Sequence, residues 1–432
     1  MPLSKFTAES AMALPGPDSL RDLRRAAAER FEAAELPTEA EEVWRYSRID
    51  ELDLDRFRPP GADAPLPLDP MPRPLYALLE SLGPRAGSVV TRNGRVVRAE
   101  VDPSLSERGV VIGTAGEVPE AAEMLGQVAE PAPDAYVELA TAFAADPVVL
   151  RVPDGVVIEQ PLVVLHWVDA DGSATFPRTV VSAGEGSRVA LVEHVASDAI
   201  TALVVPVVEL DVADGADLSY VAVQEVSAET WYIGYQASRV GQDARLSSFT
   251  AAFGGDYARV RTDSLLVGRG GTSKLLAAYF GDGEQMHDFR TMQDHVGPKT
   301  TSDLLFKGAV EDRARSVYTG LIRVRKGAAG TNAFQTNRNL VLSEGAHANS
   351  VPNLEIDESD VSCSHASAVG PIDEEQRYYL ESRGIPSEAA ERLIVLGFFD
   401  DILGRAPVPG VDRVLREAVT GKLAHAGLGG GR

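Results

Sequence analysis

A long succession of β-branched, apolar segments constrains the fold of this chain more than any other feature. Over roughly 200 residues, segments such as VVIEQPLVVLHWV, RVALVEHV and TALVVPVVELDV follow one another, and no helical pattern interrupts them. A strand-rich region of this kind predicts a sandwich, a barrel or a β-helix.

A weak internal repeat within this region favours the β-helix. The segments AGEGSRVALVE, VADGADLSYVA, GQDARLSSFTA and RGGTSKLLAAY each place a turn before a polar residue and an apolar strand. Their turn positions are separated by 29, 28 and 28 residues, and they are Gly186, Gly215, Asp243 and Gly271. A fixed spacing of this size is typical of stacked coils, in which each coil covers the apolar face of its neighbour.

The N-terminal part has a different residue pattern from the β-rich region. Residues 18 to 50 show helical spacing of apolar residues, interrupted by Pro37, with a second short helix expected around Glu39 to Tyr46. A Pro-rich stretch, residues 58 to 74, predicts an irregular connector. The segment SVVTRNGRVVRAEV then predicts a hairpin whose turn is Asn93-Gly94.

The residue pattern changes again after Gly370, from strands to helices. The segments DEEQRYYLESRG, IPSEAAERLIVLGFFDDILGR and VDRVLREAVTGKLAHAG have the caps and apolar stripes of three helices. We therefore divide the chain into an N-terminal helical and mixed region (1–135), a mainly β core (136–372) and a C-terminal helical module (373–432).

Composition narrows the classes of partner. The formal net charge is −23, from 64 acidic and 41 basic residues, which disfavours binding to nucleic acids or anionic membranes. An acidic face for a basic partner stays open. A single cysteine, no secretory h-region and no apolar run long enough to span a bilayer together predict a cytoplasmic location.

That single cysteine lies in DVSCSHAS, where Cys363 is followed by His365. On a strand these two side chains share one face, because positions i and i+2 point the same way. A tetrahedral zinc site or an iron–sulfur cluster usually takes four ligands, so this chain alone cannot hold a cluster stably. A metal here needs ligands from another chain or from distant residues. The alternative is that Cys363 packs as a small hydrophobe and His365 is a hydrogen-bonded core residue.

Self-contained catalysis finds little support. No HExxH or CxxC motif, no G-x-x-x-x-G-K-[ST] phosphate loop and no G-x-S-x-G elbow occurs. We therefore expect a non-catalytic protein that does not hydrolyse ATP.

The segment TNAFQTNRNLVLSEGAHANSVPNLEIDESDVSCSHASAVGPIDEEQRYYLESRGIPSEAAERLIVLGFF (331 to 399) closely resembles the SufB/SufD family of iron–sulfur cluster assembly proteins. The elements NRNLVLS, P-x-LEI, CSHA and YYLESRGIP stand in the family's order and spacing. Similarity extends upstream through DHVGPKTTSDLLFKGAVED, TAFAADPVVLRVPDGVVIEQPL and EVWRYSRIDELDLDRF. Members of the SufB branch generally carry several cysteines, so one cysteine favours the SufD branch.

The resemblance implies a mainly β fold with a right-handed parallel β-helix core between helical ends. It also implies pairing with a SufB-like subunit, docking of a SufC-like ATPase on the C-terminal helices, and a transient iron–sulfur cluster shared with SufB. His365 then becomes the favoured interfacial ligand and Cys363 the second candidate. Phe398 and Phe399 become candidates for the ATPase-docking surface, with burial inside the helical module as the alternative.

Two other functions remain open from the residues alone. A β-helix enzyme acting on polysaccharide could use Glu355 and Asp357, whose i, i+2 placement suits paired carboxylates. A purely structural homodimer would need no metal chemistry.

Overall fold

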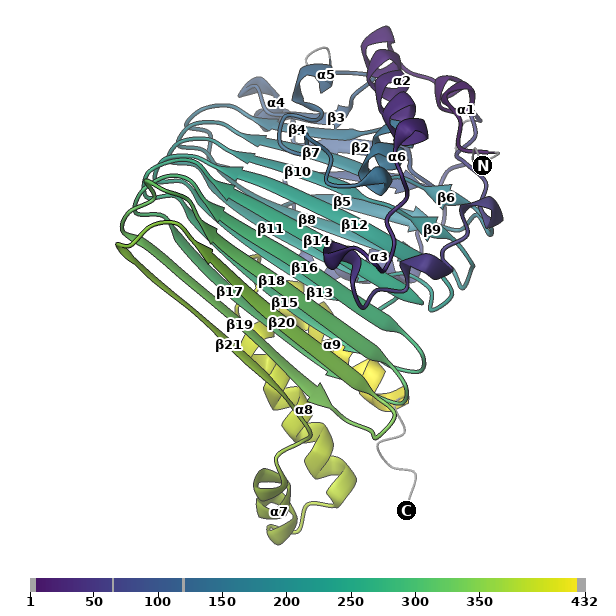
Figure 1. Cartoon of the computed structure of the whole chain (residues 1–432). Coiled ribbons are helices and arrows are strands. Elements are labelled where there is room, and N and C mark those ends of the chain that lie inside the picture. The colour runs from purple at the N-terminus through teal and green to yellow at the C-terminus, as the bar shows by residue number, and fades with distance from the viewer. Residues whose placement is uncertain (1–4, 64–65, 119–120, 426–432) are drawn as a thin grey trace.

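The computed structural model describes residues 5–63, 66–118 and 121–425, and in these ranges it is a parallel β-solenoid of about 8 turns with helices on its outside (Figure 1). Successive strands alternate between two facing sheets, so the predicted mainly β solenoid is confirmed. Sheet 1 has the order β2-β1-β5-β8-β11-β13-β15-β17-β19-β21, and its strands are β1 (Gly87–Arg92), β2 (Arg95–Val101), β5 (Leu162–Val168), β8 (Arg188–Ser197), β11 (Asp217–Glu225), β13 (Arg245–Ala252), β15 (Thr272–Gly281), β17 (Thr301–Val310), β19 (Thr331–Val341) and β21 (Val361–Gly370). Sheet 2 has the order β20-β18-β16-β14-β12-β10-β7-β4-β3, and its strands are β3 (Val111–Thr114), β4 (Val148–Val152), β7 (Arg178–Ala183), β10 (Val207–Val212), β12 (Trp231–Val240), β14 (Tyr257–Leu266), β16 (Met286–His295), β18 (Arg315–Val324) and β20 (His347–Ile356). The short β9 (Leu203–Val204) pairs with β12, and the short β6 (Ala174–Thr175) pairs with β9.

The repeat seen in the sequence corresponds to a ladder of turns along one edge of the solenoid. The N–H of Gly186 donates to the carbonyl of Asp214, and the N–H of Gly215 donates to the carbonyl of Gln242. Gly186, Gly215 and Asp243 all have a positive φ, of 62°, 68° and 52°. In the fourth turn the positive φ, 73°, belongs to Gly270, so the predicted position Gly271 is off by one residue. The shift arises because the next strand pairs Arg245 with Thr272, one residue earlier than a strict 28-residue period requires.

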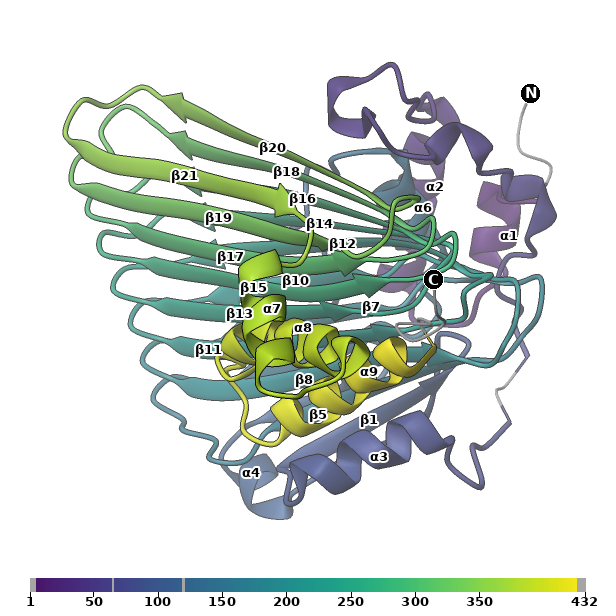
Figure 2. The same ribbon diagram turned by 90° about the horizontal axis from the view of Figure 1, so that it is seen from below.

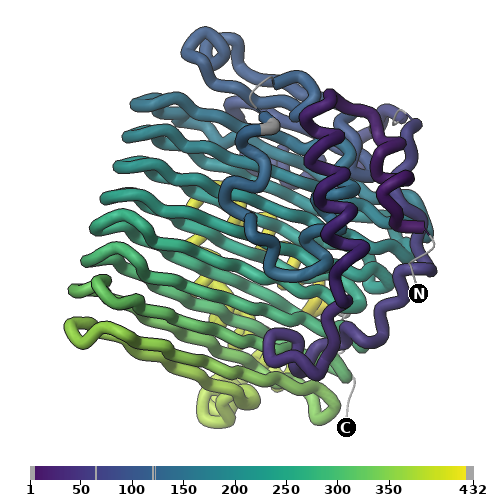
Figure 3. The backbone as a smooth tube through the Cα atoms, turned by 45° about the horizontal axis from the view of Figure 1, so that its top comes forward, coloured from purple at the N-terminus to yellow at the C-terminus, as the bar shows by residue number. Residues whose placement is uncertain are grey.

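Helices of the N-terminal region lie on both outer faces of the solenoid. The helices α2 (Asp18–Ala33) and α6 (Ala135–Phe143) cover sheet 2 (Figure 3), whereas α3 (Arg73–Leu82) packs on sheet 1. The helices and 3₁₀ turns of this region are α1 (Ala8–Met12), α2 (Asp18–Ala33), η1 (Glu42–Trp44), η2 (Ile49–Glu51), η3 (Leu54–Arg56), α3 (Arg73–Leu82), α4 (Pro103–Glu107), α5 (Ala121–Met124) and α6 (Ala135–Phe143). The hairpin of β1 and β2 forms with its turn at Asn93-Gly94, as predicted. Part of the Pro-rich connector, residues 64–65, lies outside the described residues.

The second helix expected near Glu39 to Tyr46 is a short 3₁₀ turn instead. The reason is tertiary. The Arg259 guanidinium lies 3.7 Å from the centroid of the Trp44 ring, and Arg259 donates to the carbonyl of Val43 over 2.9 Å. A buried cation that binds a backbone carbonyl and an aromatic face holds this segment against sheet 2 as a single 3₁₀ turn.

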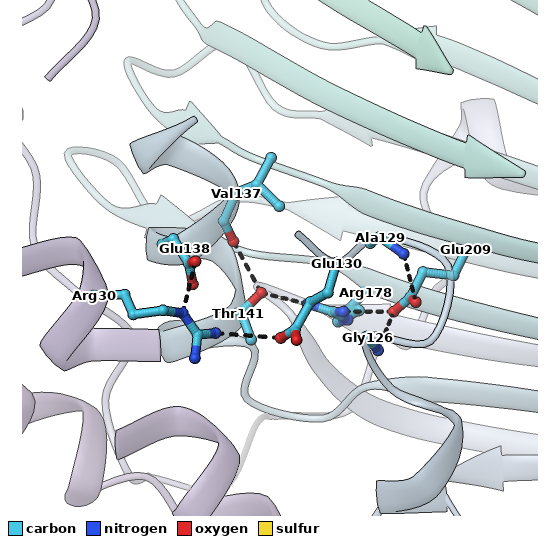
Figure 4. A network of polar contacts seen from close by, with 9 residues as sticks. All are labelled: Arg30, Gly126, Ala129, Glu130, Val137, Glu138, Thr141, Arg178 and Glu209. Carbon is cyan, nitrogen blue, oxygen red and sulfur yellow. Dashed lines mark hydrogen bonds and ion pairs between the residues drawn. The ribbon is translucent and has the colours of Figure 1, made fainter. Parts of the chain in front are cut away.

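A buried polar network joins the N-terminal helices to sheet 2 (Figure 4). Arg178 of β7 pairs with Glu209 of β10, and Arg178 also donates to the hydroxyl of Thr141 on α6. Glu209 accepts the backbone N–H groups of Gly126, Val128 and Ala129. Burial acts to raise the pKa of Glu209, but Arg178 and these N–H groups outweigh it and hold that pKa below its usual value.

The C-terminal helices α7 (Glu374–Ser382), α8 (Ser387–Leu403) and α9 (Val411–His425) leave the last strand, and α8 and α9 return along the outer face of sheet 1 beside α3 (Figure 2). Buried residues of α8 and α9 share one hydrophobic core with α3 and the strands. At the other boundary, α6 packs on α2. The domain limits 135/136 and 372/373 stay predictions, because the cores are shared across both. Within the described residues no helix is both long and apolar enough to cross a membrane.

Candidate functional site

The two ends of the solenoid differ. At the N-terminal end the antiparallel strands β2 and β3 finish the sheets, whereas the C-terminal end finishes in β20 and β21, whose outer edges pair with no other described strand. At the C-terminal end, interior-facing side chains of the last coil are more exposed than those of the coil before it. Val324 on β18 is 0% exposed, but its register neighbour Ile356 on β20 is 42% exposed. Val369 on β21 is 45% exposed beside the buried Asn339. The open end therefore presents inward positions that no further coil covers.

Cys363 and His365 both lie on the inward side of β21 at this open end. Their register neighbours on β19 are Ala333 and Gln335, which are 0% and 1% exposed because they face the interior. Cys363 is half-buried and packs against the small apolar cluster that contains Ile322 and Ala333. Burial raises the pKa of the Cys363 thiol, which disfavours the thiolate that a metal requires. His365 is exposed and faces the open end.

The donor set near His365 is small. Among the described residues, no group of three or more His, Cys, Asp or Glu side chains is placed to hold a metal ion. His365 and Cys363 thus supply two donors at most, so an iron or a cluster bound here would need its remaining ligands from outside this arrangement.

Gln335 is a polar residue of this end that the sequence analysis did not single out. Its side chain is buried, and among the described residues neither atom of its amide has a hydrogen-bond partner. The alternation in TNAFQTNRN carries the signal that could have found it, because Gln335 stands two residues before Asn337 on the inward face.

The structure separates the two phenylalanines proposed for docking. Phe399 is 0% exposed, and its ring stacks on Phe280 of β15 with the ring centroids 6.0 Å apart. Phe399 therefore holds α8 on the solenoid and offers no surface to a partner. It is buried, which was the alternative to docking, but against a strand of sheet 1 rather than inside the helical module alone. Phe398 is half-buried, and the Lys307 ammonium lies 4.7 Å from its ring centroid.

Phe398 also lines an open groove between α7 and α8. The exposed apolar side chains of this groove are Tyr379 and Leu393, which are 56% and 51% exposed. We call this surface the α7–α8 groove, and it consists of Leu340, Pro371, Asp373, Glu375, Gln376, Tyr379, Leu380, Leu393, Ile394, Gly397 and Phe398.

Other residues of types that often take part in catalysis are either buried or lie on the surface outside the α7–α8 groove. His166 contacts the Thr91 hydroxyl and a Glu193 carboxylate oxygen, both over 2.8 Å, in an arrangement of hydroxyl, imidazole and carboxylate. These side chains are sealed inside the solenoid, where no substrate reaches them. Glu355 forms a 2.7 Å surface ion pair with Arg323, and Asp357 follows the end of β20.

The fold and its open end define a parallel β-solenoid protein with an uncovered terminal coil. Residues 166–398 match the family model described as SUF system FeS cluster assembly, SufBD core domain, and residues 7–164 match the SufBD protein N-terminal region. The chain therefore belongs to the SufBD family.

Named relatives agree with this assignment. An iron–sulfur cluster assembly SufBD family protein of Mycobacterium tuberculosis is 40% identical over 226 residues, which cover 50% of this chain and 56% of that protein. The match thus spans a little over half of the mycobacterial relative's length. Two iron–sulfur cluster assembly proteins named SufD are also similar. The one from Bacillus subtilis is 32% identical over 63% of each chain, and the one from Escherichia coli is 26% identical over 92% of this chain and 90% of its own.

Proposed function

We propose that this chain is a non-catalytic, SufD-like scaffold subunit of a cytoplasmic complex that assembles iron–sulfur clusters, and that its open end pairs with a SufB-like subunit. The observation that carries the proposal is the uncovered terminal coil. Free edges of β20 and β21 offer backbone hydrogen bonds to added strands. The exposed inward residues Ile356 and Val369 offer apolar surface beside those edges.

The proposed metal chemistry uses the same open end. His365 is the favoured ligand of a nascent cluster, because it is exposed at the pairing surface and its imidazole binds iron when neutral. Cys363 is the second candidate, and its packing and raised thiol pKa favour a structural role. The cluster is cargo shared with the partner, which supplies the other ligands.

The α7–α8 groove is the proposed docking surface for a SufC-like ATPase. It combines exposed apolar side chains, Tyr379 and Leu393, with the rim carboxylates of Asp373 and Glu375. Apolar residues inside a polar rim are the usual composition of a protein interface.

Co-purification with the SufB-like subunit tests the pairing. Val369→Asp places a carboxylate on the open end, and Val296→Asp places one on an exposed turn between β16 and β17, at a residue that is 36% exposed. We expect Val369→Asp to abolish co-purification and Val296→Asp to leave it intact. Retention of the partner by Val369→Asp would refute pairing through the open end.

The same free edges also suit a second copy of this chain, so a structural homodimer is the alternative. It predicts that tagged and untagged copies co-purify from cells in place of the SufB-like subunit, and that Val369→Asp prevents this self-association instead.

A further inference from the structure

Gln335 differs from the other buried amides of its strand, which are hydrogen-bonded. Asn337, the next inward residue of β19, donates to the Tyr279 hydroxyl over 3.1 Å, and Asn339 donates to the Asn337 side-chain oxygen over 2.8 Å. The oxygen of Asn339 accepts the Tyr279 hydroxyl proton over 2.6 Å. Gln335 is as deeply buried as these residues, yet both atoms of its amide lack a partner within the part of the chain that the structure describes. Buried polar groups without partners are rare, and each needs a specific reason.

The opposite sheet makes room for this amide. A Cβ atom at Gly320 of β18 would lie 2.5 Å from both the oxygen and the nitrogen of the Gln335 amide, and 2.3 Å from the Tyr318 hydroxyl. Any side chain at Gly320 would therefore fill the space that the amide occupies. Gly320 does not have a positive φ, so the backbone itself does not require a glycine at this position. The missing side chain matters for the space it leaves.

The terminal coil covers this space with two residues. His365 lies beside Gln335 in register on β21, and Pro352 lies beside Gly320 on β20. Proline carries no hydrogen-bonding group on its side chain, whereas imidazole carries two nitrogens. The Tyr318 hydroxyl, which shares this space, already forms a 3.1 Å hydrogen bond with the Thr291 hydroxyl. Of the two register neighbours on the terminal coil, His365 is therefore the one whose side chain can satisfy the Gln335 amide.

We propose that Gln335 is the positioning residue of His365. The structure holds the two residues as register neighbours without a hydrogen bond between them. When the exposed His365 imidazole turns inward, its N–H donates to the Gln335 amide oxygen. The hydrogen bond selects one tautomer and leaves the other nitrogen, unprotonated, directed to the open end. A histidine that ligates a metal commonly donates its second N–H to a fixed acceptor, which orients the ring. The ligand role of His365 rests on the proposed function, but the hydrogen bond itself does not.

The test is the tautomer ratio of His365 in the isolated full-length chain, measured by ¹⁵N NMR with ring-labelled histidine. The His365 signals are identified by their absence in His365→Ala. We expect Gln335→Met, which keeps the side-chain length and removes the amide, to shift the tautomer ratio roughly fivefold, as expected for the loss of one ordinary hydrogen bond. Gln293→Met is the matched control, because Gln293 is another buried, inward-facing glutamine whose amide lacks a partner, and its register neighbour is Ile322 rather than His365.

An unchanged ratio in Gln335→Met, or an equal shift in Gln293→Met, would overturn the proposal. If Gln335→Met does not fold, Gln335→Asn withdraws the amide by one methylene and is expected to give the same shift. No cluster or partner is needed for this measurement. Its failure is therefore distinct from failure of the proposed function, which would appear as full cluster assembly by His365→Ala in cells.

Discussion

Arg178 and Glu209 form an ion pair that is sealed between α6 and sheet 2, with side-chain exposures of 2% and 0%. The pair connects the N-terminal helices to the solenoid, because Glu209 also binds three backbone N–H groups of residues 126–129. A buried ion pair adds little over apolar packing, but removing one partner leaves the other charge buried and unpaired.

The first prediction concerns this pair. Glu209→Leu is expected to lower the free energy of unfolding by about 3–5 kcal/mol, because the Arg178 guanidinium loses its counter-ion in a dry environment. Urea unfolding of the purified variant measures the loss. Asp211→Leu is the control, since its 2.6 Å pair with Arg239 is partly exposed and is worth at most about 1 kcal/mol. Equal losses of stability in the two variants would show that the buried pair does not hold the N-terminal helices on the solenoid.

The second prediction concerns His365→Ala. Because His365 is exposed and forms no side-chain hydrogen bond with the residues that the structure describes, the substitution should cost at most about 1 kcal/mol of stability. Cluster assembly in cells that lack the native gene should nevertheless fail. Complementation assays run beside thermal melts measure both effects. Ser364→Ala, on the opposite side of β21, is the control and should complement. Full complementation by His365→Ala would remove the ligand role.

The third prediction is a pH dependence of stability. Burial, followed by the nearby carboxylates of Asp312, Asp282 and Glu391, raises the pKa of Glu311 to about 7. A carboxyl with a raised folded-state pKa stabilises the fold at low pH, and that contribution is lost as pH rises from about 4.5 to about 7. The free energy of unfolding of the wild type should therefore fall by up to about 3 kcal/mol over this range, and Glu311→Gln should not show this fall.

Urea unfolding at pH 5 and pH 8 measures this slope. Glu344→Gln is the control, because it removes one carboxylate from the exposed neighbouring turn. If the wild type and Glu311→Gln lose the same stability between the two pH values, the Glu311 carboxyl does not carry the dependence.

The fourth prediction separates folding from docking on α8. Phe399→Ala should cost about 3–5 kcal/mol, because it leaves a cavity between α8 and sheet 1. Leu393→Ala, at a residue 51% exposed in the α7–α8 groove, should leave stability within about 0.5 kcal/mol and weaken binding of the ATPase partner. Thermal melts and pull-down measurements distinguish the two effects. Unchanged ATPase binding by Leu393→Ala would argue against the groove as the docking surface.

Much of the fold could be predicted because its determinants are local. The Asn93-Gly94 turn requires two residues that accept positive φ, and both have it, at 50° and 77°. The alternation along β21 likewise places Cys363 and His365 on one face from the sequence alone. Family resemblance then identified the solenoid and its class of function.

Two features could not be predicted from local sequence, because long-range packing determines both of them. The segment near Trp44 carries helical spacing, but Arg259, more than 200 residues away in sequence, binds it in another conformation. Phe398 and Phe399 are adjacent and chemically identical, yet only Phe399 points into the core formed with Phe280. No local pattern distinguishes them, because both fit the apolar stripe of one helix.

The sequence by itself determined the period of the coils, the turns that separate them and the side of each strand on which a residue lies, since steric and alternation rules act over a few residues. Only the tertiary structure decided what covers each position. Inward positions are identical in pattern at Val324 and Ile356, but one is buried and the other is exposed because no further coil follows β20 among the described strands. Burial depends on neighbours that are distant in sequence, and for that reason the open end, and the unpartnered Gln335 beneath it, became visible only in three dimensions.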